Sequence, residues 1–438
     1  MINSKPTKRK ILFVSPVGEF YGGGERSGFE FCKFLEKQNF QVITAVPRSS
    51  KVYVRELKKS NMDYRLLECD DFENQIIGRG HPSFSKAVSQ LVEVIKKDEI
   101  ALVITNLYAQ SGPIAAVLAG VPNISMDRGQ AYEDDYFADF MTQFSDAVIV
   151  NSMGLADIYK QKYDIDTPVA YSYTARPLVG LDETIKPRRL VCVSRVSPEK
   201  NLLEVLKAAK ILKAKNIFDG DILMIGPVPG ETEKRYKKQL EAYAKENNLI
   251  SHIHWLGDQK NPWKLVGQND IYLNTSDKES IGRSSIEAIK LGVPAILADI
   301  PGHKDIFEKI GAVKYRMGDS VDLAEKITQM IQNYPESKRF AETSRQKAED
   351  IISKENCYKN VLPLINSIGD KTRITSTDIF AYITGLIYEQ HGAIIQNQHN
   401  YEHEIALRDR QLAEFLGIKR SARLLLGNIK RKIKRSLR

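Results

Sequence analysis

The sequence feature that most limits the fold of this chain is a regular alternation of short apolar runs with helix-length segments. Continuous runs rich in β-branched residues, each followed by a helix, are typical of parallel sheets that are covered on both faces. The runs form two successive series. The expected strands are 11–15, 41–46, 64–67, 101–105, 123–125 and 147–151, and then 190–194, 222–226, 252–255, 271–274 and 293–297.

Two series of strands predict two doubly wound α/β domains rather than one barrel, because the alternation is broken after Tyr173. Pro177, Gly180 and Pro187 interrupt the periodicity at this point, as expected of a linker. We therefore predict a first domain over 1–174, a second over 175–368 and a helical extension over 369–438. The helices expected between the strands include 26–38, 83–97, 133–144, 202–215, 233–247 and 284–291.

The net charge of +9 is carried by one end of the chain. The sequence holds 64 Lys plus Arg and 55 Asp plus Glu, and 419–438 contribute nine basic residues and no acid. Removing those nine leaves 55 basic residues against 55 acids over the rest of the chain. This distribution excludes a uniformly basic nucleic-acid-binding surface, and the tail lacks the aromatic residues that stack on bases.

In the tail, 418–438, Leu and Ile alternate with Lys and Arg. This pattern favours an interfacial amphipathic helix that binds an anionic membrane surface, and a solvated charged tail is the alternative. Apolar residues of 377–390 share one helical face, so we expect that 377–416 could form an oligomer contact. The heptads are too few to predict a coiled coil.

Three further features predict a cytoplasmic protein, and the tail predicts that it is peripheral on the inner face of the cell membrane. Four cysteines lie far apart without a CxxC pair, which fits a reducing compartment better than a disulfide framework. The first residues indicate a β-strand after a basic leader rather than a signal peptide. The uncharged stretch 100–126 is broken by Asn106, Gln110 and Pro113, so we expect strand, loop, helix and strand rather than a membrane span.

A glycine-rich turn, GEFYGGGER over 18–26, follows the first expected strand and opens a helix. Gly23 and Gly24 would let the backbone approach a ligand closely and adopt positive φ, and the helix start offers unpaired N–H groups to a phosphate. The spacing is not that of the dinucleotide fingerprint. A purely structural turn is the alternative.

The second candidate site is the loop after strand 190–194. Arg195 and Lys200 flank Pro198 there, at the carboxyl end of the second sheet, where open α/β folds bind ligands. Two cations at this edge suit a diphosphate leaving group. The alternative is a solvated pair of surface cations.

The third candidate site follows strand 271–274, in the segment TSDKESIGRSSIEAIK. Glu279 on the loop could hold sugar hydroxyls, and Glu287 one turn into the helix could hold ribose hydroxyls. The residues between them at the helix start would present backbone N–H groups to an anion. These residues are Gly282, Arg283, Ser284 and Ser285. A helix-capping loop with ordinary surface carboxylates is the alternative.

Taken in order, these motifs resemble the retaining glycosyltransferases of the GT-B fold, specifically glycosyltransferase family 4 (glycosyl transferases group 1). Arg195 and Lys200 match the family's Arg-x4-Lys element, and Glu279 and Glu287 match its Glu-x7-Glu element. The GVP strand start at 292–294 and the GGGE turn at 22–25 are also similar, and the resemblance covers about 10–368.

The resemblance implies two Rossmann-like domains with an interdomain cleft. It implies transfer of a sugar, with retention, from a nucleotide-sugar donor to a hydroxyl of a glycan, and we expect this glycan to be lipid-linked. Arg195 and Lys200 would bind the diphosphate, Glu279 the donor sugar, and Glu287 the ribose. The amides of 281–285 would cradle phosphate, and neither a metal nor a cofactor is implied.

The sequence departs from the family in the first domain. Members often carry a histidine near the end of the strand that corresponds to 123–126, where this chain has Met126-Asp127-Arg128. We hypothesise that Asp127 and Arg128 line the acceptor side. The missing histidine keeps open an inactive glycosyltransferase-like assembly subunit. Among enzymes of similar architecture, the alternative is a GT-B nucleotide-sugar epimerase.

Overall fold

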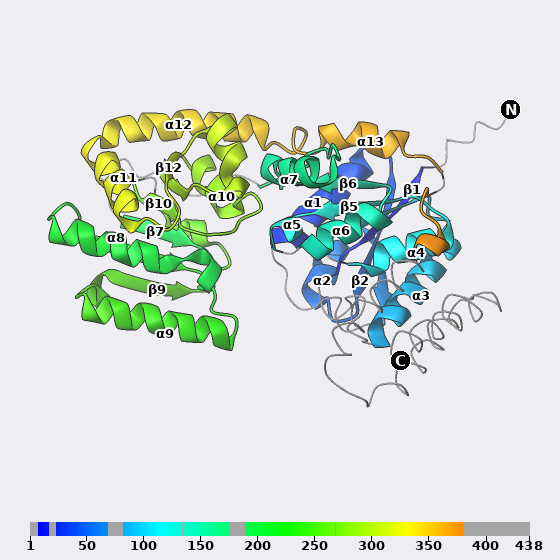
Figure 1. The fold of residues 1–438 in the computed structure, drawn as a ribbon, viewed down its shortest axis with the longest axis horizontal. Coiled ribbons are helices and arrows are strands. Elements are labelled where there is room, and N and C mark those ends of the chain that lie inside the picture. Colours follow the sequence, from blue (N-terminus) through cyan, green and yellow to red (C-terminus); the bar gives the residue numbers. More distant parts are fainter. Residues whose placement is uncertain are drawn as a thin grey trace, which may run out of the picture.

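The structure is a computed structural model that describes residues 8–16, 23–68, 82–107, 109–133, 135–174, 189–267, 269–370 and 372–379. It contains two α/β domains side by side, each built around a parallel sheet (Figure 1). The fold class expected from the sequence is confirmed. The predicted tail, 418–438, lies outside the described residues, as does the predicted oligomer segment beyond 379.

The first sheet has the strand order β3-β2-β1-β4-β5-β6, and every pair is parallel. Its strands are β1 (Lys10–Val14), β2 (Gln41–Pro47), β3 (Asp63–Leu67), β4 (Leu102–Asn106), β5 (Asn123–Asp127) and β6 (Ala147–Val150). The helices of this half are α1 (Gly23–Lys37), α2 (Lys51–Lys59), α3 (Pro82–Lys97), α4 (Ser111–Ala119), α5 (Gln130–Glu133), α6 (Asp135–Phe144) and α7 (Met153–Tyr163).

Residues of β1 show why its apolar run has no polar face. Ile11 and Phe13 pack in the same cluster as α1 and α2, whereas Leu12 and Val14 pack in the cluster of α3 and α4. All four side chains are fully buried. Both faces of this sheet are therefore covered at β1, as its continuous apolar run predicts.

The second sheet repeats the arrangement, in the order β12-β11-β10-β7-β8-β9 and with all pairs parallel. Its strands are β7 (Arg189–Val193), β8 (Asp221–Ile225), β9 (Ile253–Gly257), β10 (Ile271–Asn274), β11 (Ala295–Ala298) and β12 (Val313–Tyr315). Its helices are α8 (Leu202–Ala214), α9 (Glu231–Glu246), α10 (Arg283–Lys290), α11 (Ser320–Gln332) and α12 (Tyr334–Ile351). The sequence pattern missed β12, because this short strand carries the exposed Lys314.

Both sheets reverse their strand order at one point, between β1 and β4 in the first and between β7 and β10 in the second. In open parallel sheets such a switch point opens a crevice at the carboxyl ends of the strands. The glycine turn follows β1, and the two charged motifs follow β7 and β10. All three predicted sites therefore lie at switch points.

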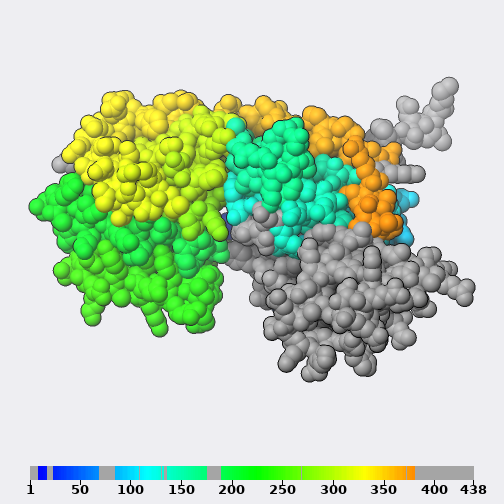
Figure 2. Space-filling model, viewed as in Figure 1, coloured from blue at the N-terminus to red at the C-terminus, as the bar shows by residue number. Residues whose placement is uncertain are grey.

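The chain returns to the first domain after α12, which runs along one side of the molecule towards α13 (Leu362–Ser367) (Figure 1). Figure 2 shows this returning segment, in orange, lying on the first domain. The Tyr358 ring lies 5.2 Å from that of Phe31 on α1, and Arg9 donates to the Ile365 carbonyl at 2.8 Å. The sequence assigned 357–368 to the second domain. In the structure this segment packs on the first domain instead.

A buried lysine joins the two points at which the chain passes between domains. Lys290, at the end of α10, donates to the carbonyl oxygens of Thr174 at 2.7 Å and Ile352 at 2.9 Å. Thr174 precedes the passage into the second domain, and Ile352 follows α12. Burial lowers the pKa of Lys290, and the two carbonyls offset that cost.

None of the helices that the structure describes is long and apolar enough to cross a bilayer. The stretch 100–126 forms β4, α4 and β5, as the polar residues within it predict.

Replacing Lys290 with Met tests its role at the two passages. We expect the free energy of unfolding to fall by about 2–4 kcal/mol, since each buried carbonyl left without a donor costs ~1–3 kcal/mol. Urea denaturation measures the loss, with Lys210→Met on the exposed face of α8 as the control. A loss no larger than that of the control would show that Lys290 does not tie the passages together.

Candidate active site at the domain interface

The carboxyl ends of the two sheets face each other across the domain interface. Arg283, at the start of α10, donates to the Gly23 carbonyl at 3.2 Å and to Ser27 Oγ at 2.9 Å, both on α1. Asn151, after β6, donates to Ser280 Oγ at 3.0 Å. The predicted motifs of the two domains therefore meet, although they lie more than 200 residues apart in the chain.

A largely buried ion pair forms the centre of the second-domain site. Lys200 Nζ lies 2.8 Å from Glu279 Oε1, and the two side chains are only 14% and 16% exposed. Ser276 Oγ donates to the same oxygen at 2.9 Å. Burial acts to raise the pKa of Glu279, but the Lys200 charge and the Ser276 hydroxyl outweigh it and hold the pKa below its usual value. Glu279 is therefore a carboxylate at neutral pH.

The two members of this pair come from neighbouring strands. Lys200 follows β7 and Glu279 follows β10, which pair in the sheet. Thr275 Oγ1 also donates to the Lys200 carbonyl at 2.9 Å, which joins the two loops through the backbone. The pair is therefore a consequence of the strand order.

Arg195 lies on the same loop as Lys200 but has a different partner. Its Nη2 lies 3.0 Å from Glu199 Oε1, and the Arg195 side chain is 48% exposed. Because an exposed ion pair contributes only ~0–1 kcal/mol, Arg195 can exchange Glu199 for an incoming anion at little cost. The sequence pattern did not single out Glu199.

The start of α10, the candidate anion site, has no capping side chain. Its N-cap, Gly282, has φ +67°, a left-handed conformation that glycine adopts without strain. Ser284 and Ser285 are fixed from β10, since Tyr272 OH lies 2.8 Å from Ser284 Oγ and Asn274 Nδ2 lies 2.9 Å from Ser285 Oγ. The first turn of α10 is consequently held in place against β10.

Glu287 lies one turn further along α10 and is 21% exposed. Trp263 Nε1 donates to Glu287 Oε2 at 2.8 Å, and Arg283 Nη2 lies 3.5 Å from Oε1. The sequence pattern missed Trp263, because nothing in its spacing from Glu287 places it there. It lies in the short 3-10 turn η3 (Pro262–Leu265) between β9 and β10.

His303 lies beneath the α10 start and is fully buried. Its Nδ1 donates to the Ala298 carbonyl at 2.9 Å, and burial lowers its pKa, so the ring is neutral. A Cβ atom on Gly282 would lie 2.7 Å from His303 Nε2. The ring therefore supports the turn and leaves room only for glycine above it.

The glycine turn of the first domain is described from Gly23 onward, and both Gly23 and Gly24 belong to α1. Neither has the positive φ that the sequence suggested. Close approach requires glycine instead, since a Cβ on Gly24 would lie 2.9 Å from Leu107 and one on Gly23 would lie 3.1 Å from Arg283.

Asp127 and Arg128, the hypothesised acceptor-side residues, are both buried. Asp127 accepts from the Gly129 and Ala131 amides at 2.8 and 3.1 Å and from Tyr159 OH at 3.0 Å. Arg128 Nε donates to Asn106 Oδ1 at 2.6 Å. These contacts shape the turn after β5, and this turn touches the second domain, where a Cβ on Gly129 would lie 3.0 Å from that of Ser280.

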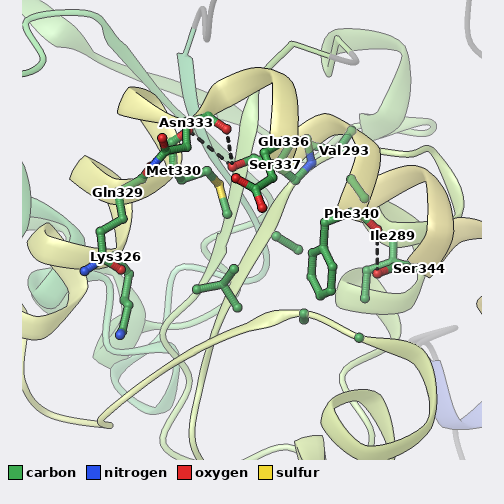
Figure 3. Close-up of a pocket in the computed structure, with 16 residues that line it drawn as sticks. Ile289, Val293, Lys326, Gln329, Met330, Asn333, Glu336, Ser337, Phe340 and Ser344 are labelled. Atoms are coloured by element: carbon green, nitrogen blue, oxygen red, sulfur yellow. Dashed lines mark hydrogen bonds between the residues drawn. The ribbon is translucent and has the colours of Figure 1, made fainter.

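A cavity of about 330 Å³ lies elsewhere in the second domain (Figure 3). Residues of α10, α11 and α12 line it together with the residues that precede β11 and β12, and Phe340 and Met330 contribute to its apolar wall. None of the predicted site residues lines it. Within the described ranges, no three His, Cys, Asp or Glu side chains are grouped to hold a metal ion.

Comparison with known proteins extends these observations. Residues 181–347 match the family described as Glycosyl transferases group 1, and this match contains Arg195, Lys200, Glu279 and Glu287. Anabaena HepE, solved with UDP and glucose, has a TM-score of 0.67 and 17% identity, covering 82% of this chain and 100% of HepE. A glycosyltransferase from Rickettsia africae has a TM-score of 0.65 and 18% identity, covering 82% and 97%. The chain has the GT-B fold.

Curated relatives match shorter segments of this GT-B chain. N-acetyl-alpha-D-glucosaminyl L-malate synthase of Bacillus anthracis is 26% identical over 193 residues, 42% of this chain and 48% of that enzyme. The capsular polysaccharide biosynthesis glycosyltransferase CapM of Staphylococcus aureus is 23% identical over 177 residues, 40% of this chain and 45% of CapM. The matched segments thus span less than half of each relative.

Substituting Gly282 with Ala separates backbone strain from steric conflict in this GT-B site. Gly257 is the matched control, because it lies in the same domain with φ +63° and nothing within 4 Å of the position of an added Cβ. Both variants place an alanine in the left-handed backbone conformation, but only in Gly282→Ala does the new Cβ meet His303. We therefore expect the free energy of unfolding, measured by urea denaturation, to fall by about 1–3 kcal/mol more in Gly282→Ala than in Gly257→Ala. Equal losses would show that His303 can move aside.

Proposed function

We propose that the protein is a retaining glycosyltransferase that moves a sugar from a nucleotide-sugar donor to a hydroxyl of a glycan. The buried Lys200–Glu279 pair beside the start of α10 carries the proposal. A buried ion pair costs desolvation energy that simple packing would avoid, so its place at a switch point indicates a function rather than stability. The family match over 181–347 supports the same activity.

The donor diphosphate would lie between Arg195, Lys200 and the N–H groups that open α10. These groups supply the positive charge that a phosphate needs, so the proposal includes no metal and no cofactor. Glu287 would accept hydrogen bonds from the ribose. The complexes of HepE with UDP and with UDP-glucose support a nucleotide-sugar donor for a protein of this fold.

In the proposed sugar transfer, each site residue acts where charge develops on the donor. Glu279, held by Lys200 and Ser276, would accept hydrogen bonds from sugar hydroxyls close to the reacting carbon. As the bond from that carbon to the diphosphate breaks, Arg195 and Lys200 would stabilise the negative charge of the departing nucleotide. The acceptor hydroxyl attacks the oxocarbenium-like carbon on the same face and passes its proton to the departing phosphate oxygen, so the configuration is retained.

Fewer contacts in the structure support a proposal for the acceptor. We propose a lipid-linked glycan acceptor, with the enzyme in the cytoplasm and peripheral on the membrane through 418–438. The names of CapM and of the Escherichia coli lipopolysaccharide 1,6-galactosyltransferase, which is 34% identical over 88 residues, 19% of this chain and 24% of that enzyme, support a role in polysaccharide assembly.

One observation favours a second candidate, a glycosyltransferase-like assembly subunit without activity. Three donors occupy the carboxylate of Asp127, which stands where the family often has a histidine. Its side chain is fully buried, so it offers no free group to a substrate. A transfer assay distinguishes the two candidates.

Neutralising the central pair tests the catalytic proposal. We expect Lys200→Met and Glu279→Gln each to lower the transfer rate by roughly 10²–10³, because each removes charge that faces the developing transition state. The donor is first chosen by thermal stabilisation with a panel of nucleotide sugars. NMR of the product reports the anomeric configuration.

The exposed pair Lys234–Glu231 on α9 provides the matched controls Lys234→Met and Glu231→Gln, which should leave the rate unchanged. Full activity in both site variants would remove the site assignment. Absence of transfer by the unaltered protein with every donor that stabilises it would favour the assembly subunit.

The membrane proposal has a separate test. We expect the intact protein to float with phosphatidylglycerol-containing liposomes, and a chain ending at Ile418 to remain unbound, since each basic residue near an anionic surface contributes ~1 kcal/mol. Binding should weaken as salt increases, and purely zwitterionic liposomes serve as the control. Unchanged flotation of the shortened chain would disprove a membrane role for the tail.

A further inference from the structure

Trp263 is a neutral hydrogen-bond donor aimed at the carboxylate of Glu287. Its side chain is 4% exposed, and its indole N–H reaches Glu287 Oε2 at 2.8 Å. Indole nitrogen can only donate, so this contact occupies one oxygen of the carboxylate and leaves its negative charge in place.

The position of the indole is itself fixed by neighbouring elements. The Trp263 ring lies 6.0 Å from the ring of Tyr272 on β10, at an interplanar angle of 48°. Tyr272 in turn holds Ser284 at the start of α10. Trp263 therefore contacts both the strand and the helix that carry the second-domain site, and its N–H has a defined direction.

The two oxygens of Glu287 are thus unequal. Oε2 has a short contact with a buried donor, whereas Oε1 has a 3.5 Å contact with Arg283, which itself binds Gly23 and Ser27 of the first domain. The long contact leaves Oε1 as the better acceptor for a new donor. Two adjacent hydroxyls on a ribose present such donors.

We propose that Trp263 is a positioning residue for the nucleotide, whose indole N–H holds Glu287 in the orientation that receives the ribose hydroxyls. The inference rests on the proposed function, in which Glu287 binds ribose. It adds two properties. Discrimination between ribose and 2′-deoxyribose depends on Trp263, and the indole environment changes when a nucleotide occupies the site.

The chain contains two tryptophans, and the second is a suitable control. Trp255 lies on β9 at the edge of the sheet, with Lys237 above its ring at 5.3 Å, and packs with residues of α8 and α9. Its indole makes no hydrogen bond to Glu287. Trp255→Phe therefore removes one indole while the Glu287 contact stays intact.

The test is calorimetric titration of the full-length protein and of both Trp→Phe variants with UDP, GDP and their 2′-deoxy counterparts. We expect the unaltered protein and Trp255→Phe to prefer the ribonucleotide of the base that binds. Trp263→Phe should bind that ribonucleotide about tenfold more weakly and lose most of the preference. A merely structural role for Trp263 would weaken both nucleotides equally and leave their ratio unchanged, which would overturn the proposal.

A fluorescence measurement does not require any change at Trp263. In Trp255→Phe the remaining emission comes from Trp263, and we expect the ribonucleotide to shift it, whereas Trp255 emission in Trp263→Phe should stay constant. If Trp263 emission stays unchanged while a nucleotide is shown to bind, this inference is overturned and the proposed function is not. If neither these nucleotides nor any nucleotide sugar of the stabilisation panel binds the unaltered protein, both the proposed function and the inference are disproved.

Discussion

Every strand in both sheets runs parallel to its neighbours, and the site follows from this constraint. Parallel strands require crossover connections, so all the loops that leave their carboxyl ends emerge at one edge of the sheet. The loops after β7 and β10 consequently place Lys200 and Glu279 side by side. The same rule brings the start of α1 to the corresponding edge of the first sheet, where Arg283 reaches it.

The charged residues near the interface differ in how deeply they are buried and in the partners they have. Glu279 and Lys200 are buried together, and each satisfies the other at a desolvation cost that stability alone does not explain. Arg195 and Glu199 form an exposed pair that exchanges partners at low cost. Lys290 is buried at the opposite end of α10, where carbonyl oxygens rather than a carboxylate surround it. One short helix thus begins at the candidate site and ends at both passages between the domains.

Much of the fold could be predicted from the sequence, because a strand covered on both faces must be apolar at every position. The run over 11–14 in β1 shows this pattern, whereas β12 carries Lys314 and was missed. The motif residues were found because their types and order match a known pattern. Trp263 and Lys290 could not be found in this way, since each acts on groups that are distant in sequence and near only after folding.

The sequence by itself determined the parallel α/β architecture, the two series of strands and the types of charged residue that follow β7 and β10. Local periodicity and residue chemistry carry that information. Only the tertiary structure decided that Glu199 pairs with Arg195, that the Asp127 carboxylate accepts hydrogen bonds within its own turn, and that 357–368 pack on the first domain. These outcomes depend on which donors, acceptors and apolar side chains meet in three dimensions, and spacing along the chain does not determine that choice.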